Sequence, residues 1–267
     1  MQKQYDKVII IHPGTQHAYR LANTIASIFS LKKIRLYTWF TLPSHSPLAR
    51  ISFFKNRIKK IDRSVRVKNY PIFELFLIIH KKINNYLNFK KNNNPYYLWQ
   101  TMFSFFLLPF IYISRKKTIL IVFETCGWPI TKYAKKWGVL VIMDFSAISH
   151  EAAIALGIKE TKFGIKIKTL ERKYIDYGFN CSHFAASTYV GKTSAIKHYP
   201  IWLGTDFQLT NEEVPPIIHN KEYNCCCIGN NALTKGIDIL LEAFNRINHH
   251  DKKLYIIAGC NGAGKTT

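Results

Sequence analysis

Short apolar runs alternate along the chain with segments in which apolar residues recur at helical spacing. Val8–Ile11 is a β-branched run; a turn follows, and from Ala18 to Phe29 apolar residues return every three or four positions. This pattern predicts a strand, a loop and a helix. Further strand-like runs are Ile34–Thr38, Ile119–Phe123, Val139–Met143 and Cys181–Ala186, with helix-length segments at Pro129–Trp137 and Ile165–Tyr177. Such alternation predicts an α/β fold with a parallel sheet covered on both faces.

The pattern changes near residue 204. Residues 204–222 contain Gly204, Pro215 and Pro216 among polar residues without a clear period, which is typical of a linker. A strand, a helix and a second strand are then predicted at Tyr223–Ile228, Ile237–Ile247 and Lys253–Ala258. We therefore predict a first domain at 1–203, a linker at 204–222 and an incomplete second domain at 223–267, because one βαβ unit cannot close a doubly wound core.

One segment, Trp99–Ile113, is almost wholly apolar and aromatic. It is short for a membrane span and contains Pro109, so it is predicted to be buried or interfacial. Between Lys55 and Lys117 the chain has 14 Lys and Arg residues against Asp62 and Glu74. Two interpretations stay open: a core helix beside a solvated charged face, or attachment to an anionic bilayer surface.

Composition narrows the classes of protein. With 48% hydrophobic residues in 267 the chain can bury a core, which excludes a disordered protein. The net charge of +22 favours anionic partners, although a compositional bias toward lysine explains the excess equally well. No C-x-x-C pair occurs among the six cysteines, so neither a zinc site nor a disulfide framework is indicated, and no signal-peptide pattern opens the chain. These features favour a reducing, cytoplasmic location.

Two candidate sites follow predicted strands of the first domain. The turn from His12 to His17 contains Gly14 and Thr15, and it would place backbone N–H groups at the carboxyl edge of the sheet, where open α/β folds bind ligands. The segment from Asp144 to Glu151 includes His150, which can carry a proton or bind a polar substrate.

Two more candidates lie near the C-terminus. Between Gly229 and Gly236 the chain turns from strand to helix, and Lys235 at the helix entrance would direct an ammonium group at a phosphate. The last residues match the P-loop pattern, with Gly259, Gly264, Lys265 and Thr266 at its defining positions. The chain stops at Thr267, without the helix and magnesium-binding acid that nucleotide hydrolysis requires, so we do not expect an active ATPase.

Several of these pieces occur in an order that resembles the family-four retaining glycosyltransferases, over roughly Val8 to Gly259. The residues that carry the resemblance are the His12–His17 turn, Thr169–Arg172, Cys181–Ser187, Gly204-Thr205-Asp206, Ile228-Gly229 and Lys235–Phe244. The resemblance implies the GT-B architecture, two Rossmann-like domains that bind the acceptor mainly through the first and a nucleotide-sugar through the second. It implies transfer with retention, without a metal or other cofactor.

Residue roles follow from the same resemblance. Gly14 and Thr15 correspond to the loop near donor phosphates and acceptor, with His17 on the acceptor side. His150 corresponds to the histidine near the transferred sugar, and Gly229 with Lys235 to the donor-phosphate site. A fixed ammonium group there would stabilise the charge that develops on the leaving pyrophosphate.

The chain also departs from the family pattern. Asn230 stands where the family usually has an arginine, and the family's pair of glutamates eight positions apart is missing. Gly262–Thr267 resembles an ATPase P-loop instead. We therefore expect a truncated or fused product that is weakly active or inactive as it stands.

The expected partners are a nucleotide-sugar, a glycan or lipid-linked acceptor of surface polysaccharide synthesis, and an anionic membrane surface on the cytoplasmic side, with no specific nucleic acid. Two other functions stay open. One is a fragment of a P-loop nucleotide-binding protein, and the other is a noncatalytic module that binds anionic ligands.

Overall fold

The computed structural model describes residues 5–14, 17–29, 33–51, 57–86, 95–201, 223–229, 237–247 and 252–258. It divides into two compact units, Met1–Gly204 and Thr205–Thr267. The predicted linker from 204 to 222 lies outside the described residues.

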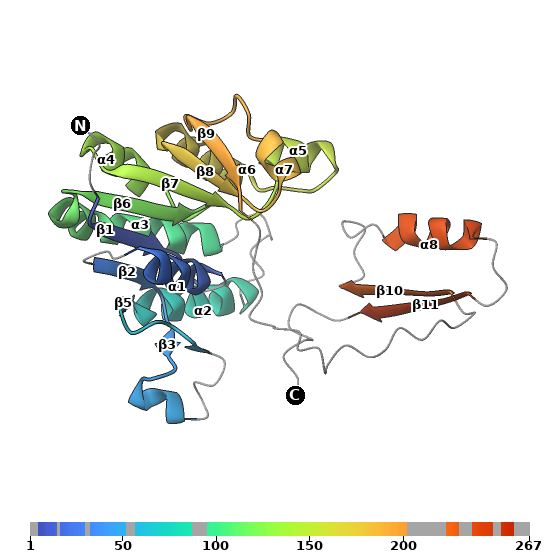
Figure 1. Ribbon diagram of the computed structural model, residues 1–267, viewed down its shortest axis with the longest axis horizontal. Helices are drawn as coiled ribbons and strands as arrows, with labels where there is room; N and C mark the ends of the chain where they lie inside the picture. Colours follow the sequence, from blue (N-terminus) through green and yellow to red (C-terminus); the bar gives the residue numbers. More distant parts are fainter. Residues whose placement is uncertain are drawn as a thin grey trace. The chain divides into compact units, whose positions relative to one another are not determined.

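A seven-stranded parallel sheet forms the centre of the first unit (Figure 1). Its strand order is β5-β2-β1-β6-β7-β8-β9, so the chain builds outward from β1 to one edge and then returns to build outward from β6 to the other. The strands are β1 (Lys7–Ile11), β2 (Lys33–Thr38), β5 (Val65–Asn69), β6 (Thr118–Phe123), β7 (Leu140–Phe145), β8 (Tyr177–Asn180) and β9 (Lys197–Pro200), and a separate short pair joins β3 (Leu42–Pro43) to β4 (Ile58–Lys59). This order confirms the predicted doubly wound α/β arrangement.

Helices cover both faces of this sheet (Figure 1). Among its described residues, the helical segments of the first unit are α1 (Ala18–Ile28), η1 (Pro47–Arg50), α2 (Pro71–Tyr86), α3 (Pro95–Ser114), α4 (Ile130–Lys136), α5 (His150–Ala155), α6 (Lys162–Glu171), η3 (Arg172–Tyr174) and α7 (His183–Ser187). Because side chains alternate along a strand, Ile9 and Ile11 of β1 pack with α2, α3 and α4, while Val8 and Ile10 pack with α1. The central strands are therefore buried on both faces.

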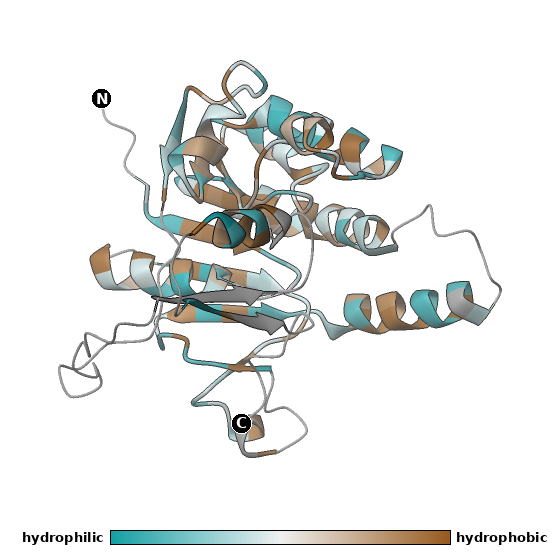
Figure 2. Cartoon of the chain, turned by 90° about the vertical axis from the view of Figure 1, so that its right-hand side faces the viewer, coloured by the Kyte–Doolittle hydropathy of each residue, from teal (hydrophilic) through white to brown (hydrophobic). Residues whose placement is uncertain are grey.

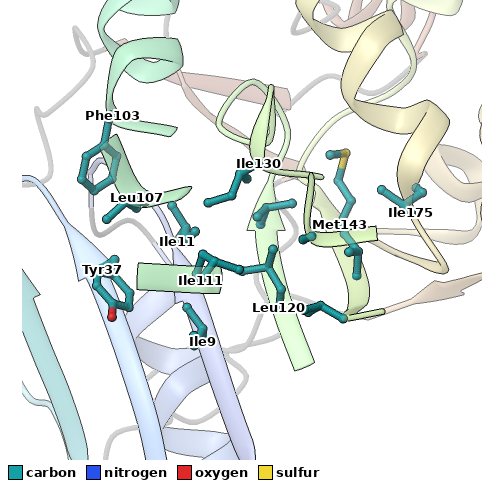
Figure 3. Packing of buried hydrophobic residues seen from close by; sticks show 14 of the residues in the cluster. Ile9, Ile11, Tyr37, Phe103, Leu107, Ile111, Leu120, Ile130, Met143 and Ile175 are labelled. Atoms are coloured by element: carbon teal, nitrogen blue, oxygen red, sulfur yellow. The ribbon is translucent and has the colours of Figure 1, made fainter. Parts of the chain in front are cut away.

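The larger core lies between the sheet and α3 with α4 (Figure 3). Phe103, Leu107 and Ile111 recur at helical spacing on α3 and are almost fully buried against the central strands. Ile130 of α4 continues this layer over Met143 of β7.

The apolar segment at residues 99–113 packs one of its sides into the core of the first unit. Residues 99–113 lie within α3, which is 20 residues long and is, in the described part of the chain, the one helix long and apolar enough to cross a membrane by length and composition. Its inner side belongs to the core of the first unit, as described above. The core-helix interpretation therefore accounts for that side of α3.

The prediction of a strand at Cys181–Ala186 is wrong. This segment forms the short helix α7, and the strand of this region, β8, comes earlier at Tyr177–Asn180. Ser182 explains the helix, because its Oγ caps the first turn by accepting a hydrogen bond at 3.0 Å from the backbone N–H of Ala185. The helix predicted to Tyr177 correspondingly ends as α6 at Glu171, followed by η3.

The second unit has two parallel strands, β10 (Tyr223–Gly229) and β11 (Lys252–Ala258), joined through α8 (Ile237–Arg246). Gly229 is the last residue of β10 and pairs in register with Ala258 of β11. The predicted strand, helix and strand of this unit are thus confirmed.

Candidate active site at the carboxyl edge of the sheet

The strand order creates a switch point between β1 and β6. The chain leaves β1 toward β2 and leaves β6 toward β7, so the two connections diverge on either side of this pair. Open α/β sheets bind ligands in the crevice outside the carboxyl ends of strands at such a point. The residues that follow β1, β6 and β7 are therefore the candidate site.

The turn after β1 is fixed by hydrogen bonds to the neighbouring strand. The carbonyl of Pro13 accepts from the Thr38 hydroxyl at 3.1 Å and from the backbone N–H of Trp39 at 3.1 Å. Gly14 lies just beyond, and a Cβ built there would meet nothing closer than His12 Cε1 at 3.9 Å. The sequence prediction placed Gly14 and Thr15 at this edge; the structure shows Gly14 there, whereas Thr15 lies outside the described residues.

His17 is the N-cap residue of α1 and contacts the end of β7. Its Nε2 lies 3.4 Å from Oδ2 of Asp144, and its ring meets the Phe123 ring edge-on with centroids 4.9 Å apart. Both polar side chains are largely but not fully buried. A carboxylate at this distance can form an ion pair with the imidazole, although Nε2 of His17 has no hydrogen-bond partner among the described residues.

Neighbouring His12 has a different environment. It is buried, its ring packs edge-on against Phe123 at 4.6 Å, and its Nδ1 has no hydrogen-bond partner among the residues that the structure describes. Burial, and next the charge of His17, lower the pKa of His12 to about 3. His12 is therefore a neutral part of the wall behind His17.

His150 is the first residue of α5, after the loop that leaves β7. Its Nε2 lies 3.4 Å from a terminal nitrogen of Arg172 and 3.3 Å from Oε1 of Glu151, and Arg172 and Glu151 also form an ion pair. Burial, and next the positive charge of Arg172, lower the pKa of His150 despite Glu151. His150 is thus predominantly a neutral imidazole at pH 7, suited to hydrogen bonding with hydroxyl groups.

The loop before His150 is anchored on both sides. Ser149 accepts a hydrogen bond at 3.3 Å from the backbone N–H of Ala152, and its own N–H donates to the Thr188 hydroxyl at 3.0 Å. Lys192 reaches the Ser149 hydroxyl at 3.4 Å. The helix α7 leads directly into Thr188, one of the residues that hold this loop. This is the segment for which the strand prediction is wrong.

A buried acidic cluster lies beneath the turn after β6, and the sequence prediction did not assign it to the site. Glu171 accepts hydrogen bonds from the backbone N–H groups of Thr125 at 2.6 Å and Gly127 at 2.8 Å. Glu124 accepts from the Tyr189 hydroxyl at 2.9 Å and lies 3.9 Å from the Lys168 ammonium group. The sequence signal that identifies Glu124 as a candidate is its position directly after the central strand β6.

The electrostatics of this cluster follow from burial. Burial raises the pKa of Glu124, against the opposing charge of Lys168. Burial, and next the charge of Glu124, raise the pKa of Glu171 to about 8, although the two backbone N–H bonds oppose the shift. The turn they support includes Thr125, whose φ of 75° is unusual for a β-branched residue.

The other predicted site residues lie elsewhere in the chain. Gly229 ends β10 of the second unit. Lys235, Gly259, Gly264, Lys265 and Thr266 lie outside the described residues, so their roles stay predictions. Within the described ranges no group of three or more His, Cys, Asp or Glu side chains is placed to hold a metal ion.

Comparisons with solved structures identify the fold of the chain. The chain is similar to the lipopolysaccharide outer core galactosyltransferase WaaB in its apo form, with a TM-score of 0.55 and 12% identity, covering 97% of this chain and 62% of that protein. The chain has the α/β fold of GT-B glycosyltransferases. It spans less than two thirds of the length of WaaB.

More distant likenesses are to the trehalose-6-phosphate synthase OtsA and to a UDP-glucosyltransferase from Polygonum tinctorium. Their TM-scores are 0.47 and 0.45 at 13% and 8% identity, over 96% of this chain in both cases and over 66% and 72% of those proteins. No family model matches the chain, and no curated protein matches it by sequence.

Proposed function

We propose that the protein is a glycosyltransferase that moves a sugar from a nucleotide-sugar to a glycan or lipid-linked acceptor. The observation that carries the proposal is the placement of Gly14, the His17–Asp144 pair and His150 at the carboxyl edge of a sheet with the fold of a galactosyltransferase. In such folds this edge is where ligands bind. Surface polysaccharide synthesis on the cytoplasmic side of a membrane is the setting that we propose.

Each residue of the edge has a role in the proposed reaction. Gly14 leaves space for a ligand to approach the backbone, since among the described residues, chain neighbours aside, only the His12 ring lies within 4 Å of the position where a Cβ would stand. His17, oriented by Asp144, hydrogen-bonds the acceptor hydroxyl, and neutral His150 hydrogen-bonds a hydroxyl of the transferred sugar. Both contacts position the two substrates without a bound metal.

The donor phosphates need positive charge, because negative charge develops on the leaving group. The resemblance assigns that role to Lys235 and the N–H groups at the following helix start. We further propose retention of anomeric configuration, with the leaving phosphate oxygen taking the acceptor proton. The net charge of +22 favours binding of such a donor.

Donor binding tests the proposal directly. The full chain is titrated calorimetrically with UDP-, GDP-, ADP- and CMP-sugars, together with ATP as the competing ligand. We expect one nucleotide-sugar to bind, and Lys235→Ala to weaken it about tenfold or more, while the matched surface variant Lys162→Ala leaves it unchanged. ATP binding that depends on Lys265, with none of the nucleotide-sugars bound, would instead support the P-loop alternative.

Transfer itself is followed by NMR with the donor that binds. Polyprenyl-phosphate-linked glycans serve as acceptors, and the coupling constant of the new anomeric proton reports the configuration. The α-anomer from an α-linked donor supports retention, and the β-anomer contradicts it.

A further inference from the structure

The first unit carries large apolar side chains on the outward side of α2 and α3. On α2, Ile72, Ile79 and Ile83 recur at spacings of seven and four residues and are 43–49% exposed. On α3, Met102 and Phe105 are 46% and 48% exposed, and Ile113 is 78% exposed. We call these six residues the α2–α3 apolar face.

The two helices make this face continuous. The rings of Phe76 and Trp99 stack with centroids 4.9 Å apart, and the Trp99 indole donates a hydrogen bond to His80 at 3.2 Å. Phe73 and Phe106 add an edge-on contact at 5.5 Å. Brown, hydrophobic bands alternate with teal ones along α2 in Figure 2, so charged and apolar groups share this helix. An apolar surface spread over two neighbouring helices is larger than single exposed residues produce.

The contacts on the inner side of α3 determine whether this helix can cross a bilayer or only lie on its surface. Ser104 donates a hydrogen bond at 3.1 Å to the carbonyl of Cys126, in the turn after β6, and Gln100 contacts the Cys126 sulfur at 3.4 Å. Together with the buried Leu107, these contacts hold α3 on the sheet. A helix packed in this way cannot be surrounded by lipid, so only its outward side is available.

The charges near the face are basic. Lys82 is exposed three residues after Ile79 and so shares the outward side of α2, while Lys116 and Lys117 are exposed just after α3. The acidic residue of α2, Glu74, is paired with Arg57. A second copy of this chain would bring these like charges together, whereas anionic lipid head groups complement them.

We propose that the α2–α3 apolar face docks the first unit onto the surface of an anionic lipid bilayer. Ile79, Phe105 and their neighbours enter the head-group boundary, and Lys82, Lys116 and Lys117 contact the lipid phosphates. This binding needs no sugar donor and does not depend on the proposed glycosyl transfer.

The test is cosedimentation of the full chain with phosphatidylcholine vesicles, with and without phosphatidylglycerol. We expect binding to the anionic vesicles that weakens with salt. Ile79→Glu with Phe105→Glu should reduce vesicle partitioning about tenfold or more. The control exchanges one isoleucine and one phenylalanine for the same charges at the end of α1, as Ile28→Glu with Phe29→Glu, and should leave much of the partitioning in place; these residues are 66% and 56% exposed.

A second pair of variants tests the basic contribution. Lys82→Gln with Lys116→Gln should weaken binding to anionic vesicles more than Lys162→Gln with Lys166→Gln, which removes two exposed lysines of α6. Circular dichroism establishes that all variants are folded. No vesicle binding at low salt, equal losses in the matched pairs, or a dimer that Ile79→Glu with Phe105→Glu dissociates would each overturn the proposal.

Discussion

The buried carboxylate of Glu171 accepts a hydrogen bond at 2.8 Å from the backbone N–H of Gly127, 44 residues earlier in the chain. With the second bond to Thr125, it joins the end of α6 to the turn after the central strand β6. That turn borders the switch point, so the shape of the candidate site depends on a residue that lies beneath it.

Removing this carboxylate tests how strongly the turn is held. Glu171→Ala leaves two backbone N–H groups without their acceptor, and we expect a loss of about 2–4 kcal/mol in the free energy of unfolding. Urea denaturation measures the loss. As a control, Glu160→Ala removes a carboxylate that accepts a hydrogen bond from Lys168 at 2.7 Å and from no backbone N–H group among the described residues, and a smaller loss is expected there. Equal losses would show that the two backbone hydrogen bonds of Glu171 add no stability beyond that of a carboxyl group bound to one side chain.

The raised pKa of Glu171 predicts a dependence on pH. In the folded state this carboxyl has a pKa of about 8, above its ordinary value of 4.5, so the folded protein binds more protons than the unfolded chain between these values. Stability contributed by this group therefore falls as pH rises from 4.5 to 8. Thermal melting of Glu171→Gln should show a shallower decline over that interval than the unaltered protein. Parallel melting curves would contradict the shift.

Two glycines at the edge should respond differently to the same substitution. A Cβ at Gly127 would stand 2.9 Å from Met143 Cε and 3.1 Å from Glu171 Oε2, whereas one at Gly14 would meet His12 Cε1 at 3.9 Å. We expect Gly127→Ala to cost about 1–3 kcal/mol of stability and Gly14→Ala less than about 0.5 kcal/mol. Denaturation of both variants measures this difference. Any loss of donor or acceptor binding in Gly14→Ala then reports on ligand approach.

The sequence predicted the local elements of this site better than its contacts. Val8–Ile11 and Ile119–Phe123 are strongly apolar runs buried on both faces, so their pattern identified β1 and β6 directly. The same pattern predicts that His17 lies in the turn after the first strand and that Asp144 directly follows another predicted strand. Their meeting at 3.4 Å depends on which strands are neighbours, and β1 and β7 are separated by β6, which no local pattern reveals.

Other elements escaped prediction for physical reasons. β5 and β9 are short edge strands with charged residues and little burial, so they lack an apolar run. In Cys181–Ala186 the apolar residues Phe184, Ala185 and Ala186 suggested a strand, but the Ser182 cap favours a helix and Phe184 is exposed. Glu171 lies in the segment Thr169–Arg172 that carries the family resemblance, but its role depends on hydrogen-bond partners 44 and 46 residues away, which no local pattern reveals.

The His17–Asp144 pair makes a prediction for the proposed transfer. Asp144→Asn keeps the shape of the side chain but removes the charge that orients the imidazole, so we expect the transfer rate to fall about tenfold or more. Asp62→Asn is the control, because Asp62 is exposed and, among the described residues, its carboxylate accepts hydrogen bonds only from Ser64. A rate unchanged in Asp144→Asn, in a protein that transfers sugar, would remove this pair from the mechanism.

His12 supplies a prediction for acidic conditions. Its pKa in the folded state is lowered to about 3, so between that value and the ordinary value of 6.5 the unfolded chain binds the additional proton. Stability from this group is therefore fully present above pH 6.5 and is lost progressively as pH falls toward 3. His12→Phe removes the titrating group and keeps a ring against Phe123, where the two centroids now lie 4.6 Å apart. Its melting temperature should fall less steeply between pH 6.5 and 4 than that of the unaltered protein. A slope equally steep in His12→Phe would show that burial does not lower the pKa of His12 in the folded state.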